Sequence, residues 1–215
     1  MSRIISIIKA VIARRSSESF ISYHRKKGIT IGDDCIVRDP LFTKIDTTRP
    51  YLVKIGNRVD MNRRFEIWTH DWGGHVLWGK YRRFINSSGK VVIGNNVYFG
   101  SDCKVLKGVS IGDNCIIGAG SLVNRDIPAN SVATGNPCRV VCSLEYYYKK
   151  RIERSVEEAI EVVNEFYDFY GKDPDDNDLK EERHFYSKIE GTDEIPMFNN
   201  RKEFIAYCHN NRKQI

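Results

Sequence analysis

The sequence predicts a mainly β protein, built as a solenoid of short strands with helices at both ends. The main observation is a six-residue repeat, because from residue 93 the chain divides into "IGNNVY", "FGSDCK", "VLKGVS", "IGDNCI", "IGAGSL" and "VNRDIP". Two further observations are the helical spacing of apolar residues near the two ends of the chain. Together they divide the 215 residues into an N-terminal basic helical segment (1–28), a repeat domain (29–142) and a C-terminal helical extension (143–215).

Each hexad carries a bulky apolar residue first and a smaller or aliphatic residue four positions later. The first series is Ile93, Phe99, Val105, Ile111, Ile117 and Val123, and the second is Val97, Cys103, Val109, Cys115, Ser121 and Ile127. Neither a helix nor an ordinary strand has this period. It fits short strands separated by sharp corners, with three sides completing a coil of about 18 residues and coils stacked at roughly 4.8 Å. We therefore expect Cys103 and Cys115 to point into the core.

The repeat also runs earlier in the chain and breaks once. Ile31 and Ile55 begin coils 24 residues apart, whereas 38 residues separate Ile55 from Ile93. The segment from about 71 to 91 must therefore leave the solenoid as a loop, and long loops on a rigid scaffold often carry function. His70 lies where the loop begins, and we expect the basic, aromatic loop to cover it.

Both ends of the chain have helical patterns. Residues 143–170 are rich in Glu, Lys and Arg, with apolar residues at helical spacing. We do not expect residues 1–15 to be a signal peptide, because Lys9 interrupts their apolar run and Arg14 and Arg15 replace small cleavage-site residues. Two interpretations of 1–15 stay open: a helix packed on the main domain, or a basic helix on a membrane surface, where lipid-linked acceptors reside.

The charges and the cysteines exclude some classes of protein. The net charge of +6 divides into seven basic residues against one acid in 1–28, fifteen against ten in 29–142, and twelve against seventeen in 143–215. This basic body and acidic tail argue against nucleic-acid binding. The six cysteines form no CxxC pair, and without a secretory signal we expect reduced thiols in a cytoplasmic protein.

The hexads, the break that bears a histidine, and the closing "SVATGNPCRVV" (131–141) resemble the hexapeptide-repeat acyltransferases, over about half of the chain. The pattern looks most like the sugar and polysaccharide O-acetyltransferases. The resemblance implies a left-handed parallel β-helix, a homotrimer with active sites between neighbouring solenoids, and acetyl-CoA as the acyl donor. It also implies the histidine about fifteen residues after a coil start, as His70 is after Ile55.

The resemblance implies a path for the coenzyme as well. Mapped by motif, the residues along it are Tyr98, Ser101, Ala119, Asn124, Arg125 and Arg139. Relatives often carry Trp in place of Tyr98 and Thr-Lys in place of Asn124-Arg125. Arg139 suits phosphate because its guanidinium is always charged and bonds oxygens bidentately. The alternative for Arg125 and Arg139 is exposed charge without a ligand.

Acetyl transfer to a hydroxyl requires a base, donors for the tetrahedral oxyanion and alignment of the two substrates. An imidazole is a suitable base near neutral pH, so we expect His70 to be the general base, with His75 as the less favoured choice. Its other ring nitrogen needs a partner, for which Asp71, Glu66, Asp60 and a backbone carbonyl stay open. We expect no metal, because related zinc enzymes use three histidines and the solenoid offers two.

The loop carries residues suited to a sugar acceptor. Trp72, Trp78 and Tyr81 could stack on a sugar ring or pack to anchor the loop, and Arg82 and Arg83 could bind an acidic glycan or the phosphates of CoA. The favoured function is acetyl transfer to a saccharide hydroxyl in cell-surface polysaccharide or lipopolysaccharide assembly. The alternatives are transfer to an amine or a non-sugar hydroxyl, such as an amino sugar, serine or an antibiotic, and a β-helix scaffold without catalysis.

Overall fold

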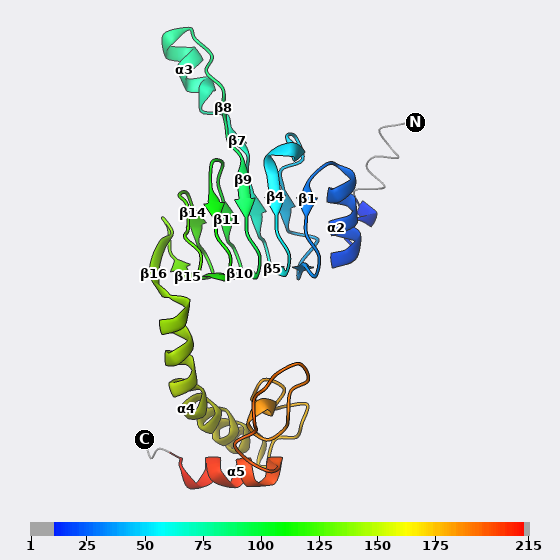
Figure 1. Ribbon diagram of the computed structural model, residues 1–215, viewed down its shortest axis with the longest axis vertical. Coiled ribbons are helices and arrows are strands. Elements are labelled where there is room, and N and C mark those ends of the chain that lie inside the picture. The colour runs from blue at the N-terminus through cyan, green and yellow to red at the C-terminus, as the bar shows by residue number, and fades with distance from the viewer. Residues whose placement is uncertain (1–10, 213–215) are drawn as a thin grey trace. The chain divides into compact units, whose positions relative to one another are not determined.

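A computed structural model describes residues 11–212 of the chain (Figure 1). The chain divides after Tyr147 into two compact units. The first unit contains every strand, and the second contains helices and irregular segments. The membrane interpretation of residues 1–15 falls mostly on residues 1–10, which lie outside the described part. Between residues 11 and 212 no helix combines the length and the apolarity that crossing a membrane requires.

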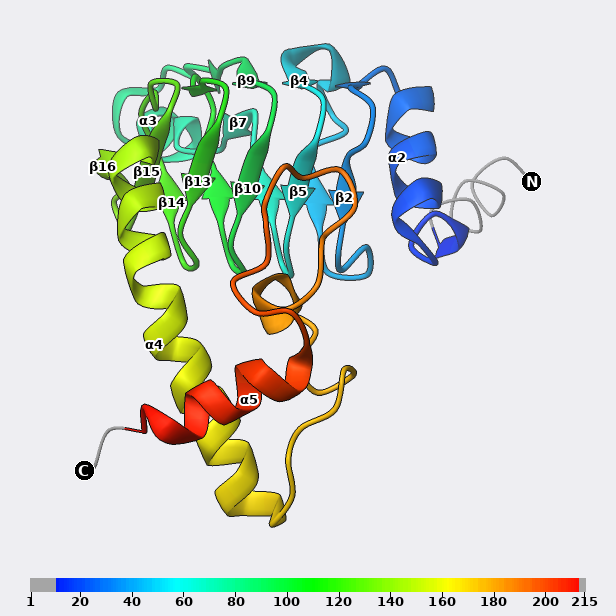
Figure 2. The same cartoon turned by 60° about the horizontal axis from the view of Figure 1, so that its bottom comes forward.

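The strands of the first unit form three sheets, named here A, B and C. Sheet A contains β1 (Thr30–Ile31), β4 (Val53–Ile55), β9 (Val91–Ile93) and β12 (Ser110–Ile111). Sheet B contains β2 (Ile36–Val37), β5 (Val59–Met61), β10 (Val97–Phe99), β13 (Cys115–Ile117), β15 (Ser131–Thr134) and β16 (Arg139–Ser143), and most of its strands lie side by side in Figure 2. Sheet C contains β3 (Lys44–Ile45), β6 (Glu66–Ile67), β11 (Lys104–Val105) and β14 (Leu122–Val123).

Successive strands enter sheets A, B and C in turn, so the chain winds as a coil with three sides. Within the three sheets every neighbouring pair is parallel except β15 and β16. Each coil therefore bonds its backbone to the coils before and after it, as a solenoid requires. The mainly β fold of short parallel strands that the six-residue repeat predicts is confirmed.

The repeat corresponds to the inward-facing side chains. All twelve residues of the two series from Ile93 to Ile127 are exposed by 2% or less. Phe65 and Phe99 pack in neighbouring coils with ring centroids 4.6 Å apart, and burial of each such side chain contributes about 1.5–3 kcal/mol. Cys103 and Cys115 do face the core, and burial raises the pKa of the Cys103 thiol to about 11. These thiols are core residues, not nucleophiles.

The corners between sheets A and B are held by a column of asparagines. Asn96, Asn114 and Asn130 all have left-handed backbones, with φ near +55° to +58°. Their side chains form a ladder, because Asn96 Nδ2 donates to Asn114 Oδ1 (2.9 Å) and Asn114 Nδ2 donates to Asn130 Oδ1 (3.1 Å). Asparagine tolerates this φ better than most residues, so one residue type supplies both the turn and the bond between coils.

Replacing Asn114 should show both contributions. Asn114→Ala loses two ladder bonds and strains a left-handed backbone, and we expect it to lower the free energy of unfolding by about 1–3 kcal/mol. Asn114→Gly loses the same bonds without the strain, so it should cost less. Denaturant unfolding of both variants measures the difference, and an alanine variant as stable as the wild type would contradict this account of the corner.

The coil breaks once, between sheet C and sheet A. After β6 the chain forms a two-stranded antiparallel hairpin, β7 (His70–Asp71) and β8 (Ser87–Ser88), with helix α3 (Gly74–Tyr81) between its strands. Residues 70–88 are called the arm below. Figure 1 shows the arm projecting outward from the coil, with α3 at its outer end.

Two helical elements of the first unit lie against or within the coil. Helix α2 (Ser17–Lys26) begins at the N-cap Ser16, whose hydroxyl accepts from Ser19 N–H, and it buries Phe20 beside β1 and β2. A short 3₁₀ helix, η1 (Pro50–Leu52), precedes β4.

The second unit has a core of its own. Helix α4 (Leu144–Tyr170), which confirms the helix predicted for 143–170, begins just before the boundary between the units. It is followed by η2 (Glu182–Phe185) and α5 (Arg201–Asn210). The core residues of this unit are Ala159, Val163, Leu179, Phe185, Tyr186, Phe204, Ile205 and Cys208.

Candidate active site

His70 is held at the foot of the arm by a carboxylate from the preceding coil. His70 Nδ1 lies 2.7 Å from Asp46 Oδ2, and the two side chains are 16% and 3% exposed. Asp46 directly follows β3, and its N–H donates to Ile67 O of β6 (3.1 Å). The pairing of β3 with β6 therefore places the carboxylate beside the point where the chain turns out into the arm.

Asp46 is surrounded by hydrogen-bond donors. Its Oδ2 accepts from the N–H and the hydroxyl of the buried Thr69, and its Oδ1 accepts from Thr48 N–H (2.9 Å) and Thr48 Oγ1 (2.7 Å). Burial alone would raise the pKa of Asp46, but the bonds from Thr69, Thr48 and His70 outweigh it and hold the pKa well below its ordinary value. The carboxylate is thus ionised and can only accept hydrogen bonds.

This geometry fixes the tautomer of His70. Because ionised Asp46 accepts, the hydrogen of the neutral imidazole is on Nδ1, and Nε2 is left with a free lone pair. No protein group among residues 11–212 bonds to His70 Nε2. An oriented imidazole with a free Nε2 and an anion behind it can take a proton and stabilise the resulting imidazolium.

The two residues favoured as orienting groups from the sequence, Asp71 and Glu66, have other partners. Asp71 forms an ion pair with Lys107, and it accepts from Ser87 Oγ (2.8 Å) and Gly73 N–H (2.9 Å). The bond from Lys107, with those from Gly73 and Ser87, lowers the pKa of Asp71 to about 2. Asp71 neighbours His70 in a strand, so its side chain points to the opposite face.

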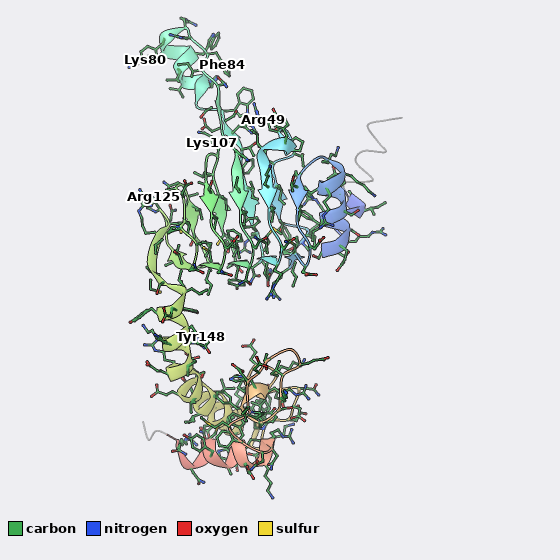
Figure 3. The ribbon with its side chains drawn as sticks, in the orientation of Figure 1. Arg49, Lys80, Phe84, Lys107, Arg125 and Tyr148 are labelled. Carbon is green, nitrogen blue, oxygen red and sulfur yellow. The ribbon has the colours of Figure 1, made fainter. Side chains whose placement is uncertain are left out.

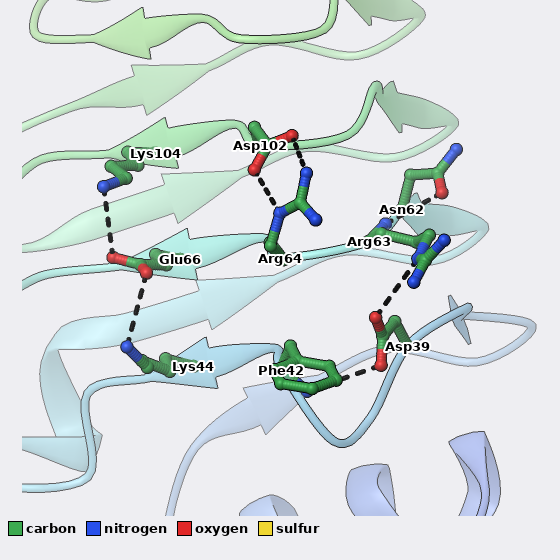
Figure 4. Close-up of polar contacts among 9 residues, drawn as sticks. All are labelled: Asp39, Phe42, Lys44, Asn62, Arg63, Arg64, Glu66, Asp102 and Lys104. Carbon is green, nitrogen blue, oxygen red and sulfur yellow. Dashed lines mark hydrogen bonds and ion pairs between the residues drawn. The ribbon is translucent and has the colours of Figure 1, made fainter.

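Glu66 lies on the outer face of sheet C. Its carboxylate accepts from Trp68 Nε1 (2.9 Å) and lies between Lys44 Nζ (3.5 Å) and Lys104 Nζ (3.9 Å), one from each neighbouring coil (Figure 4). Asp60, another open choice, is bonded by Arg38. The prediction that Asp71 or Glu66 orients His70 is therefore wrong, and Asp60 does not orient it either.

The repeat indicates only the neighbourhood of Asp46, because paired strands of successive coils are 24 residues apart at β1–β4 and 22 at β3–β6. The coil starts Ile31 and Ile55 are 24 residues apart, and the same interval before His70 is Asp46. The predicted partners Asp71, Glu66 and Asp60 are all near His70 in sequence, whereas a solenoid brings together residues one coil apart.

Comparison with known proteins supports the sequence-based resemblance. The bacterial transferase hexapeptide (six repeats) family matches residues 90–125. Protein CapG of Staphylococcus aureus is 37% identical over 135 residues, which are 61% of this chain and 75% of CapG. The chain belongs to the hexapeptide-repeat transferase family. The galactoside O-acetyltransferase of Escherichia coli K12 is 50% identical over 72 residues, 31% of this chain and 36% of that enzyme, so the chain spans only about a third of its length.

Among solved structures, a maltose O-acetyltransferase from Clostridium difficile 630 is 26% identical. The match covers 66% of this chain and 85% of that one, with a TM-score of 0.45.

Four residues assigned to the coenzyme in this hexapeptide-repeat transferase lie at the two ends of the strands of sheet C. These two rows of strand ends are called the edges of sheet C below. Asn124 and Arg125 directly follow β14, at the edge where His70 follows β6. Neighbouring coils are joined at this edge by two backbone hydrogen bonds, from Trp68 N–H to Val105 O and from Leu106 N–H to Val123 O. At the opposite edge, Ser101 O accepts from Gly120 N–H (2.8 Å), and the neighbouring Ala119 packs against Gly100, where an added Cβ would lie 2.5 Å from Ala119 N.

The other two assigned residues reach the site from sheet B. Arg139, in β16, bonds to Asn124 Oδ1 (3.4 Å) and to Cys138 O (2.6 Å), so it joins the edge that carries His70. Tyr98, in β10, is 39% exposed on the outer face of sheet B and accepts from Asn62 Nδ2 (3.2 Å). The structure thus brings Arg139 to Asn124, and it places Tyr98 on a different face.

The residues expected to bind the acceptor lie along the arm. Trp72, Trp78 and Tyr81 are 71%, 49% and 63% exposed, and Arg82 lies over the Trp78 ring at 5.7 Å. Figure 3 shows Lys80 and Phe84, on either side of Tyr81–Arg83, far out along the arm. The arm projects away from the coil, so the expectation that it covers His70 of its own chain is wrong. The Asp71–Lys107 pair and the β7–β8 bonds fasten the foot of the arm.

No group of three or more His, Cys, Asp or Glu side chains within residues 11–212 is arranged to hold a metal ion. All six cysteines are free.

The Asp71–Lys107 pair at the foot of the arm leads to a testable prediction. Lys107→Met removes the ion pair while keeping the length of the side chain. We expect faster amide exchange in residues 71–88, unchanged exchange in the coil, and a loss of less than about tenfold in kcat/KM, because His70 keeps its bond to Asp46. Lys104→Met, three residues earlier on the same coil, is the matched control. Equal exchange in the arm of both variants would contradict the role given to Lys107.

Proposed function

We propose that this hexapeptide-repeat transferase is a left-handed parallel β-helix enzyme that moves an acetyl group from acetyl-CoA to a hydroxyl of a saccharide. The single observation that carries the proposal is the geometry of His70, whose Nδ1 is bonded to the ionised Asp46 while Nε2 is free. Family membership supports the reaction class. The names of the galactoside and maltose O-acetyltransferases support a sugar hydroxyl as the acceptor.

The reaction follows from the two ends of the imidazole. Nε2 removes the proton of the acceptor hydroxyl as its oxygen attacks the thioester carbonyl carbon. The imidazolium that forms is stabilised by Asp46. When the tetrahedral intermediate collapses, the carbon–sulfur bond breaks and the proton passes from Nε2 to the sulfur of CoA. The products are the acetyl ester and free CoA, and the enzyme needs no covalent intermediate.

The coenzyme is assigned to the edge of sheet C that extends from His70 to later coils. Arg125 and Arg139 lie along this edge and supply the positive charge that phosphates require. Asn124 accepts from Arg139 and helps to position its guanidinium. We further propose a homotrimer, in which a second chain closes the outer side of each site. A neighbouring chain would also receive the exposed aromatic residues of the arm.

The experiment is thiol release from acetyl-CoA by the purified chain, with no acceptor and with neutral sugars, acidic sugars, amino sugars and serine in turn. We expect release that depends on a sugar hydroxyl and an acetyl ester as product. Release with amines or serine but with no sugar would replace the proposed acceptor class. The mass of the particle in solution, measured by light scattering, tests the trimer.

A further inference from the structure

Arg49 is a cation that the fold positions next to the catalytic pair. It follows Thr48, which donates two hydrogen bonds to Asp46, and it precedes η1. The backbone here is fixed, because Leu52 N–H donates to Arg49 O (3.0 Å) and Pro50 restricts the turn. Arg49 is therefore joined to the Asp46–His70 pair by a short, well-bonded segment.

The segment that carries Arg49 runs beside the foot of the arm. At its start Asp46 bonds Thr69 and His70, which lead into the arm, and at its end Val53 pairs with Val91, which follows the arm. Figure 3 shows Arg49 beside the base of the arm, with Lys107 on the far side of that base. Arg49 and Lys107 thus lie on either side of the base of the arm, whose first residue is His70.

Arg49 differs from two arginines of the next coil, whose side chains form ion pairs within the protein. In the part of the chain between residues 11 and 212, no hydrogen bond or ion pair is formed by its side chain, although Arg49 is partly buried. By contrast, Arg63 pairs with Asp39 and Arg64 with Asp102 (Figure 4). A guanidinium that no carboxylate of the protein occupies is available to bind an anion from outside the chain.

The direction of the coil separates this anion from the coenzyme. Asn124, Arg125 and Arg139 lie in coils after His70, whereas Arg49 lies in the coil before it. If the coenzyme occupies the later coils, the acceptor approaches His70 from the earlier side. Arg49 is then the cation that meets the acceptor.

We propose that Arg49 determines acceptor specificity by binding an anionic group, a carboxylate or a phosphate, on the saccharide that His70 deprotonates. This inference rests on the proposed function. The planar guanidinium can bond two oxygens of either anion, and its fixed backbone reduces the entropy lost on binding. This proposal assigns recognition of an acidic acceptor to Arg49, near the general base, instead of to Arg82 and Arg83, which lie out along the arm.

The test compares three acceptors that share one ring: methyl galactoside, its C6 carboxylate (the methyl galactosiduronate) and its 6-phosphate. Binding to the full-length protein is measured by calorimetry, and turnover by thiol release from acetyl-CoA. For Arg49→Gln we expect affinity for at least one of the anionic probes to fall about 10- to 100-fold, with affinity for the neutral probe nearly unchanged. Arg49→Lys should recover part of the loss. Lys54→Gln, an exposed cation on the following strand, is the matched control.

The outcomes separate the two proposals. If only the galactosiduronate loses affinity in Arg49→Gln, the group that Arg49 binds is a carboxylate. If only the 6-phosphate loses affinity, the group is a phosphate. Wild-type protein that binds neither anionic probe more tightly than the neutral sugar overturns the role of Arg49, and so does an equal loss for all three probes. If the binding difference depends on Arg49 but no probe supports thiol release, the acetyl transfer is wrong and the anion site stands.

Discussion

His70→Ala is expected to lower kcat for acetyl transfer by about 10²- to 10⁴-fold, the usual contribution of a positioned general base. Nε2 is the free basic nitrogen at the foot of the arm, and the proposed reaction requires the hydroxyl proton to leave as the oxygen attacks. KM for acetyl-CoA should change little, because the residues assigned to the coenzyme lie in later coils. The measurement is steady-state thiol release with a saccharide acceptor.

The matched control for this variant is His75→Ala. His75 is the second histidine of the same segment, but it is exposed on α3, at the outer end of the arm. We expect it to keep nearly full kcat. Full turnover by His70→Ala, or equal losses in both variants, would remove His70 from the mechanism. A thermal unfolding curve close to that of the wild type would show that the loss is chemical, since the side chain is partly exposed at the surface of the coil.

Much of the fold could be predicted from the sequence because most strands of the coil obey the same local rule. Each inward position, from Ile93 to Ile127, repeats at an interval that the three-sided coil dictates, and all of them are buried. The helix of 143–170 was equally predictable from its apolar spacing. The arm was predictable only as a break in the repeat. Its helix and hairpin have no periodic pattern and depend on tertiary bonds such as Lys107 to Asp71.

Within the site, His70 was predictable from its position at the break in the repeat, and its partner Asp46 was not. His70 lies at the seam of the repeat, so its position alone drew attention to it. Asp46 lies in an unremarkable stretch, "KIDTTRP", and its role depends on how far one coil is displaced from the next. That displacement varies along this chain, since β1 pairs with β4 at an interval of 24 residues and β3 with β6 at 22. The placement of Arg49 near the base of the arm depends on the same register, so the sequence alone did not indicate it.

Asp46→Asn is expected to lower kcat by about 10²- to 10⁴-fold although it changes one atom, because it exchanges an acceptor for a donor behind the base. Five donors now converge on the carboxylate: the N–H and hydroxyl of Thr48, those of Thr69, and His70 Nδ1–H. An amide N–H in place of Oδ2 donates to Nδ1 and so favours the imidazole tautomer with its hydrogen on Nε2. In that tautomer Nε2 cannot accept the proton of the acceptor hydroxyl. Nitrogen chemical shifts of His70 should report this change of tautomer, which a purely structural role for Asp46 would not produce.

The pH dependence of the free energy of unfolding of Asp46→Asn distinguishes the role of Asp46 in stability from its role in positioning His70. Because the folded pKa of Asp46 lies below its unfolded value, ionised Asp46 stabilises the fold above about pH 4, and this contribution is lost as the pH falls toward the lower folded pKa. The deficit of Asp46→Asn in free energy of unfolding, about 1–3 kcal/mol at neutral pH, should therefore shrink in acid. Thr48→Val removes one donor and leaves the bond to His70, so it should lose some stability and little kcat. If Thr48→Val and Asp46→Asn lose kcat equally, Asp46 serves the fold of this corner and not the tautomer of His70.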